Sequence, residues 1–387
     1  MPMIPLLPLR YATRNLMRDK IRLLQTVGGS AMVVLLLVAA AAINAGLNNL
    51  LFASGSPLNV ILLRAGSAES VQRSEISAGA AEIAVTAIPG IDTVLGHPAA
   101  SAEIHHMTGI MTEGHRMSHA LIRGVTVQAM LAHPEVRLLD GHFPGPGEIL
   151  AGRLATRALG IPPAGFRTGA TVRIENVDFT VAGSFAAPGT VMESEIWMPL
   201  GDTRTLARRD SLSCVVLRMR SPDGFDDAEL FTKQRMDLEL VAVRESDYFA
   251  NLQVFYQPVR TMTWITALLV AAGAVFGGMN TLYAAFAGRV RECGTLQAVG
   301  FSRRALLLGF IQESCLACAL GTLAGLLAAV VLLDGFSVSF ALGSFNLRVT
   351  PDIAGFGLGA GLMLGLLGAV PAAVRCLRPS LPSALRG

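Results

Sequence analysis

The chain alternates between long apolar segments and one large, more polar region. Four segments each hold about 20 or more mostly apolar residues, the length that crosses the hydrocarbon core of a bilayer as a helix. These segments are 24–52, 259–287, 305–333 and 353–374. The pattern predicts four transmembrane helices, with 53–258 as a folded domain outside the membrane. A secretory signal peptide is the alternative interpretation of the first segment, but a long basic stretch precedes it.

The region 53–258 combines the alternation typical of strands with the spacing typical of helices. Single strands are expected at 58–64 and 148–151. Two hairpins are expected, one of 104–111 with 117–124 and one of 171–174 with 179–183. A βαβ-like unit is expected from strands 214–219 and 238–243 around a helix 226–236. We also expect a helix at 68–80 and another from Glu245 into the second apolar segment. The predicted fold class is an α-helical membrane protein with four transmembrane helices plus a large mixed α/β extracytoplasmic domain inserted between helices 1 and 2.

The basic residues predict the orientation, because they collect in short loops on the cytoplasmic side of a membrane. They lie before the first apolar segment, between the second and third, and after the fourth: Arg10, Arg14, Arg18, Lys20 and Arg22; Arg289, Arg291, Arg303 and Arg304; Arg375, Arg378 and Arg386. Both termini are therefore predicted to be cytoplasmic. The segments 1–23, 288–304 and 375–387 lie on that side, and 334–352 is a short outer loop.

The arginines of the first group recur every four residues, which places them on one face of a basic amphipathic helix over 1–23. We expect this helix to anchor at the lipid headgroups, and its second possible role is to transmit force to the first transmembrane helix.

Small residues at four-residue spacing allow helices to pack closely in lipid. Three apolar segments carry such glycines: Gly273 and Gly277; Gly321 and Gly325; Gly357, Gly361 and Gly365. They predict a tightly packed bundle, and a second copy of the chain is one way to use these faces. Glu313 is ionisable well inside an apolar run, so we expect it to pair with a nearby arginine, with a proton relay as the alternative.

A charged, glycine-bounded helix between two membrane-length segments is the most distinctive feature of the chain. Such a helix is well placed to contact a partner at the membrane surface. We expect the partner to contact Glu292, Gly294, Leu296, Val299 and Gly300, while Arg289, Arg291, Arg303 and Arg304 set the depth of the helix. The alternative is that these arginines only enforce topology.

Composition and motifs exclude several classes of function. The net charge of +3, with the arginines beside apolar segments, does not favour nucleic acid. The chain has only two lysines, Lys20 and Lys233, and neither follows a glycine-rich turn, so it contains no P-loop. No serine-hydrolase elbow, zinc-protease motif or paired-cysteine zinc signature is present. We therefore expect no catalytic residue and no cofactor of its own.

All seven histidines lie between His97 and His142. His105, His115 and His119 have methionines nearby and are candidate ligands for copper or zinc. Against this, no fixed ligand spacing is present, so solvated surface histidines are the favoured interpretation. Cys214 is the only cysteine in the polar region and has no disulfide partner there.

Three stretches resemble the FtsX/MacB-type ABC permeases, including DevC-like exporters. They are Arg14-Asn15-Leu16 with Arg18, Arg22 and Thr26; Asn280-Thr281 through Arg289-x-Arg291-Glu292-x-Gly294-x-Leu296-x-Ala298-x-Gly300, with Ser302 and Glu313; and Pro371-Ala-Ala with Arg378-Pro and Ala384-Leu385-Arg386. The arrangement of one helix, an outer domain and three helices is also similar. Cys293 and Gln297 depart from the family, which often has an apolar residue and an arginine there.

The resemblance implies a permease subunit of the bacterial inner membrane that does no chemistry itself. It implies partners: a cytoplasmic ABC ATPase subunit that binds ATP and Mg, a second copy of the chain, membrane lipid, and in an envelope with two membranes a periplasmic adaptor and an outer-membrane duct. The implied function is export or extraction of a hydrophobic compound, peptide or lipoprotein by mechanotransmission. The alternatives are regulation of a cell-wall hydrolase and a peptide- or metal-sensing permease.

Overall fold

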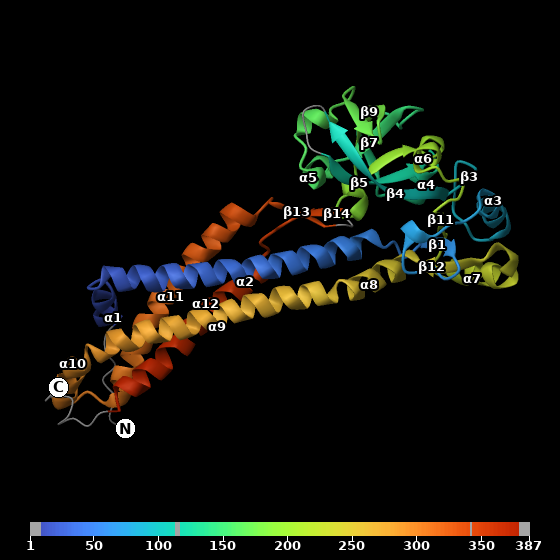
Figure 1. Ribbon diagram of the computed structural model, residues 1–387. Coiled ribbons are helices and arrows are strands. Elements are labelled where there is room, and N and C mark those ends of the chain that lie inside the picture. The colour runs from blue at the N-terminus through green and yellow to red at the C-terminus, as the bar shows by residue number, and fades with distance from the viewer. Residues whose placement is uncertain (1–8, 113–116, 341–342, 379–387) are drawn as a thin grey trace. The chain divides into compact units, whose positions relative to one another are not determined.

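The structure is a computed structural model that describes residues 9–112, 117–340 and 343–378 (Figure 1). The described residues form two compact units. The membrane unit consists of the described residues within Met1–Ala45, Pro258–Phe336 and Leu347–Gly387. The outer unit consists of those within Gly46–Gln257 and Ser337–Asn346.

Four long helices confirm the four predicted spans. They are α2 (Lys20–Ser54), α9 (Gln257–Ala287), α11 (Arg303–Leu333) and α12 (Pro351–Cys376), each long and apolar enough to cross a membrane. Side-chain caps define two of their starts, because Ser302 accepts a hydrogen bond from the amide of Ala305 and Thr350 accepts one from Ile353. The helix from Glu245 is also present as α8 (Glu245–Phe255), but one residue, Tyr256, separates it from α9.

The prediction of a single basic helix over 1–23 is wrong for residues 9–23, which the structure describes. A short helix α1 (Leu9–Leu16) ends before Met17, and α2 begins anew at Lys20. The reason is local: the carboxylate of Asp19 accepts a hydrogen bond from the amide of Arg22 at 3.1 Å and so caps the start of α2. Residues 1–8 lie outside the described part of the chain.

The glycines of α11 and α12 lie where helices approach closely. A Cβ at Gly325 would lie 2.5 Å from the carbonyl oxygen of Ala31 in α2. A Cβ would also lie within 3.2 Å of an atom of another helix at four more glycines, Gly321, Gly357, Gly361 and Gly365. Gly273 and Gly277 of α9 differ, because open space surrounds both within the described residues. Among these glycines, therefore, those of α11 and α12 allow close helix packing in the described chain, and those of α9 do not take part in it.

Gly325→Ala is expected to push α2 and α11 apart, because backbone atoms leave no room for the added methyl group. We expect a loss of about 1–3 kcal/mol, typical of overpacking. Thermal unfolding of the full chain in nanodiscs would measure it. Gly359→Ala is the matched control, because Gly359 lies in α12 with nothing within 4 Å. Equal stability of the two variants would contradict the prediction.

The outer unit is built on a ten-stranded mixed sheet with the order β12-β1-β11-β4-β5-β10-β7-β9-β6, and β8 pairs with β4 and β9. The strands are β1 (Asn59–Arg64), β4 (Ala100–Thr112), β5 (Ser118–Val125), β6 (Arg137–Gly141), β7 (Glu148–Gly152), β8 (Thr171–Ile174), β9 (Val177–Ala186), β10 (Ile196–Pro199), β11 (Cys214–Arg218) and β12 (Leu240–Arg244). A separate ribbon joins β2 (Thr93–Val94) and β3 (His97–Pro98). Both predicted hairpins are present, as β4 with β5 and as β8 with β9.

Helices cover both faces of the β12–β1–β11–β4 part of the sheet. Alternate residues such as Val60, Leu62 and Leu217 pack on one face with α3 (Ala78–Ala87) and α7 (Gly224–Gln234). The intervening residues, such as Ile61, Leu63 and Val216, pack on the other face with α4 (Ala129–Ala132) and α8. Two more α-helices of the outer unit are α5 (Ala155–Leu159) and α6 (Leu200–Ala207). This alternation follows from the two-residue period of a strand.

Two expectations for the outer unit need correction. The helix predicted at 68–80 is a 3₁₀ turn at Val71–Arg73 followed by α3, because Ser77 caps α3 by accepting a hydrogen bond from Ala80. The βαβ-like unit is split, because β1 lies between β11 and β12 and pairs antiparallel with both.

The predicted short outer loop 334–352 contains a hairpin of β13 (Ser337–Phe340) and β14 (Gly343–Asn346). This hairpin packs on the outer unit: the ring of Phe345 lies against Gly46, and the amide of Ser344 donates a hydrogen bond to Ser194 Oγ at 2.7 Å. The segment Ser337–Asn346 of this loop is therefore part of the outer unit.

Candidate functional site

The charged segment between α9 and α11 forms a short helix, α10 (Val290–Ala298). Gly300 follows it with a φ of 110°, a conformation that costs glycine little and other residues a great deal. Ser302 then caps α11. The sequence Gly-Phe-Ser therefore turns the chain within a few residues, from the surface helix to the next membrane helix.

The predicted partner-contact residues do not all lie on the surface of α10. Val299 is 73% exposed, and Arg291, Arg303 and Arg304 are exposed as well. Gly294 is buried, and Leu296 is half-buried against the cluster around Phe310. The surface open to a partner in the described chain therefore includes Arg291 and Val299.

Arg289 points away from the surface, toward Glu313. Its Nη1 lies 3.0 Å from Oε2 of Glu313, which is 2% exposed. Arg22 of α2 forms an ion pair with the other oxygen of the same carboxylate, and Asn15 of α1 donates a hydrogen bond to Oε2 at 3.0 Å. The predicted arginine pairing of Glu313 is confirmed. Its carboxylate thus connects α1, α2, the start of α10 and α11.

Arg22 was expected at the lipid headgroups, and that expectation is wrong, because its side chain is 12% exposed and pairs with Glu313. Aromatic rings enclose this pair. Phe286 and Phe310 stack at 4.1 Å, with the guanidinium groups of Arg22 and Arg289 above them. Charges in such a poorly solvated position interact more strongly than exposed ones. Arg22 and Glu313 are 291 residues apart, so no local pattern indicates their pairing.

Glu292 belongs to an outer layer of the same cluster. Its carboxylate lies 3.2 Å from Arg18 and 3.3 Å from Arg289, and its side chain is 44% exposed. Arg289 is therefore shared between an exposed and a buried carboxylate. Through these contacts the two carboxylates connect the start of α10 to α1, α2 and α11.

A second cluster of charges is buried in the outer unit. Arg123 of β5 donates two hydrogen bonds to Glu195, at 2.7 and 2.8 Å, and a third to Glu103 of β4 at 2.7 Å. The other oxygen of Glu103 lies 2.9 Å from Nε2 of His133. All four side chains are at most 7% exposed. The sequence interpretation missed this cluster.

The prediction of solvated surface histidines is confirmed for His97, His119 and His142, which are exposed. His133 is fully buried and His105 is 10% exposed, so solvated surface histidines are wrong for these two. His119 is exposed and pairs in register with Gly109, four residues along β4 from His105. His115 lies outside the described residues. The predicted convergence of His105 with His119 is therefore absent from the described part of the chain.

Burial and charge shift the pKa values of this cluster. Burial alone would raise the pKa of Glu103, but Arg123 and His133 outweigh it and hold that pKa well below its usual range. Burial would lower the pKa of His133, but Glu103 raises it to about 10. Burial raises the pKa of Glu245 to about 7, although His133 and the Ser56 amide oppose the rise. Glu245, the first residue of α8, accepts hydrogen bonds from Ser56 and Asn59.

The folded pKa of Glu245 exceeds its ordinary value of 4.5, so its contribution to stability is present below pH 4.5 and is lost as the pH rises through about 7. We expect Glu245→Gln to remove this dependence, which amounts to about 3 kcal/mol. Fluorescence of Trp197 during denaturant unfolding of the full chain, in a Trp264→Phe background, would measure it. Glu239→Gln, at an exposed side chain, is the control. An unchanged pH profile in Glu245→Gln would contradict the prediction.

Two family models match the chain. The MacB-like periplasmic core domain matches residues 24–230, and the FtsX-like permease C-terminal matches residues 264–381. One relative is the "Macrolide export ATP-binding/permease protein MacB 1/2" of Paracoccus denitrificans, 26% identical over 246 residues, which are 59% of this chain and 32% of that protein. Another, from Bradyrhizobium diazoefficiens, is 29% identical over 146 residues, or 34% and 22% of the two chains. The chain therefore matches about a third or less of the length of these relatives.

Two solved structures resemble part of this chain, both with TM-scores below 0.4. The periplasmic region of MacB from Actinobacillus actinomycetemcomitans has a TM-score of 0.39 and 10% identity, over 52% of this chain and 94% of that one. The extracellular domain of the transporter YknZ from Gram-positive bacteria has a TM-score of 0.37 and 12% identity, over 48% and 99%.

An α/β domain after the first of four apolar helices, with a short charged helix between the second and third, defines a multi-pass membrane protein of the permease type. The chain belongs to the FtsX-like permeases that carry a MacB-like periplasmic core domain.

Proposed function

We propose that this chain is the transmembrane subunit of an ABC transporter of the inner membrane, with both termini in the cytoplasm. A separate cytoplasmic ATPase contacts α10, and its ATP-driven movement displaces α10 and thereby moves the outer unit. The contacts of Arg289 with Glu313 carry this proposal, because they connect the surface helix to three other helices. The ATPase binds the ATP and Mg, so this chain needs no cofactor for the task.

The proposed cargo is a hydrophobic compound, peptide or lipoprotein that is exported or extracted from the membrane. The relatives are named for macrolide export, which supports a hydrophobic cargo. We include a second copy of the chain, a periplasmic adaptor and an outer-membrane duct in the proposed assembly.

Affinity purification of the tagged chain from native membranes, with mass spectrometry of the proteins that co-purify, tests the assembly. An ABC ATPase together with an adaptor supports export. An ATPase with a peptidoglycan hydrolase would instead support regulation of that hydrolase. Failure to recover any ATPase would contradict the proposed coupling.

Glu292→Arg is expected to separate ATP hydrolysis from export, because it puts a positive charge beside Arg18 and Arg289 at the surface of α10. Paired assays of hydrolysis and export in reconstituted vesicles would measure this effect. Asp334→Arg is the control, with the same change of charge at an exposed residue after the other end of α11. Wild-type export by Glu292→Arg would contradict the assignment of α10.

A further inference from the structure

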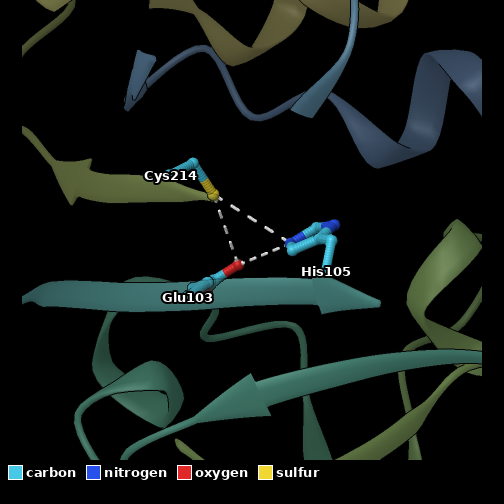
Figure 2. A group of neighbouring side chains, drawn as sticks. All are labelled: Glu103, His105 and Cys214. Atoms are coloured by element: carbon cyan, nitrogen blue, oxygen red, sulfur yellow. Dashed lines mark hydrogen bonds and ion pairs between the residues drawn. The ribbon is translucent and has the colours of Figure 1, made fainter. Parts of the chain in front are cut away.

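The sheet of the outer unit brings three metal-ligating side chains together on one face. Cys214 of β11 lies directly opposite Glu103 of β4 in the antiparallel register. His105 follows Glu103 by two residues, which places it on the same face of β4. Figure 2 shows Cys214 reaching from one strand toward Glu103 and His105 on the other. Because all three come from paired strands, their positions are held more firmly than those of loop residues.

The distances among these side chains suit a single ion. Sγ of Cys214 lies 3.9 Å from Oε2 of Glu103 and 4.0 Å from Nε2 of His105, and these two atoms are 3.1 Å apart. A tetrahedral zinc ion with bonds of about 2.0–2.3 Å holds neighbouring ligand atoms roughly 3.3–3.6 Å apart. Shifts of a few tenths of an ångström would therefore complete the site. We propose that Glu103, His105 and Cys214 bind one thiophilic metal ion, Zn²⁺ or Cu⁺, between β4 and β11.

The surrounding charges leave room for a cation. Arg123 and His133 are the two cations in direct contact with this network, and they pair with Glu103, Glu195 and Glu135. The network is therefore not positively charged overall before a metal ion binds.

Binding requires three local changes. The ion replaces the thiol proton of Cys214, which leaves to solvent, and the proton on Nε2 of His105 moves to Nδ1. Arg123 gives up its bond to Oε2 of Glu103 but keeps both bonds to Glu195. His133 still holds Oε1 of Glu103 at 2.9 Å and keeps the carboxylate oriented.

The chain offers matched controls for each ligand. Every other cysteine lies at or beyond Cys293, in the helices of the membrane unit. Cys315→Ser therefore controls for Cys214→Ser. His119→Gln controls for His105→Gln, because His119 is an exposed histidine on the neighbouring strand β5.

The test is titration of the purified full chain, in detergent and with any affinity tag removed, with Co²⁺ as a spectroscopic probe and Zn²⁺ as its competitor. We expect one equivalent of Co²⁺ to give a thiolate charge-transfer band that Zn²⁺ abolishes. Cys214→Ser should lose the band and Cys315→Ser should keep it. His105→Gln should weaken binding by more than the roughly 10- to 100-fold that loss of an outer-shell partner causes, while His119→Gln should not.

A parallel titration with Cu⁺ against a chromophoric chelator separates the two metals. Cys214-dependent binding of Cu⁺ without a cobalt band would assign the site to copper. If the wild-type chain binds neither ion, or if Cys214→Ser binds as well as wild type, the proposal is overturned. The wild-type titrations decide this even where a variant fails to fold, and they require no ATPase, so their outcome is separate from that of the proposed function.

Discussion

Replacing Glu313 by glutamine is expected to destabilise the end of the helix bundle next to α10. The substitution keeps the shape of the side chain but leaves Arg22 and Arg289, 12% and 14% exposed, without their shared anion. Removing one partner of a buried ion pair costs about 3–5 kcal/mol, and the slight exposure of both arginines favours the lower end of this range. Thermal unfolding of the full chain in nanodiscs measures the loss, and hydrogen exchange of α10 locates it.

Glu292→Gln is the matched control for Glu313→Gln. Glu292 also pairs with two arginines, but its side chain is 44% exposed and that of Arg18 is 74% exposed. Exposed ion pairs contribute about 0–1 kcal/mol, so this variant should unfold close to wild type. Equal losses in the two variants would mean that burial does not strengthen the Glu313 pairs.

The second large effect is expected in the outer unit, from Arg123→Met. Methionine fills much of the volume of arginine but leaves Glu103 and Glu195 as buried carboxylates without Arg123 as their partner. We expect a loss of about 3–5 kcal/mol, and the sheet around β4, β5 and β10 should lose its packing. Fluorescence of Trp197 reports on this region, because Trp197 lies in β10, fully buried, in register with Arg123. Trp264→Phe removes the other tryptophan.

Arg173→Met controls for the geometry of the Arg123 pair. Arg173 also makes two hydrogen bonds to one carboxylate, that of Asp178, at 2.7 and 3.1 Å. Both side chains are 52% exposed, so solvent screens the pair and this variant should unfold close to wild type. A small effect of Arg123→Met would show that water or another cation compensates the two carboxylates.

Local patterns predicted the elements that depend on neighbouring residues. The four membrane helices follow from runs of apolar residues, and the two hairpins of the outer unit follow from alternation around short turns. Apolar and polar residues also alternate in parts of Ser337–Asn346, which forms a hairpin in the structure. The sequence analysis predicted only a short loop there. The helix predicted at 68–80 failed because Ser77 begins the helix ten residues later than expected.

The sequence by itself determined the membrane topology class, the mixed α/β domain and the charged helix between the second and third spans. Each depends on composition or periodicity over at most a few tens of residues. Only the tertiary structure decided where the buried charges lie. Arg22 meets Glu313 across 291 residues and Cys214 meets Glu103 across 111, and a buried carboxylate has the same one-letter code as an exposed one. Strand register and helix packing choose such partners, because only they determine which distant side chains share a space without water.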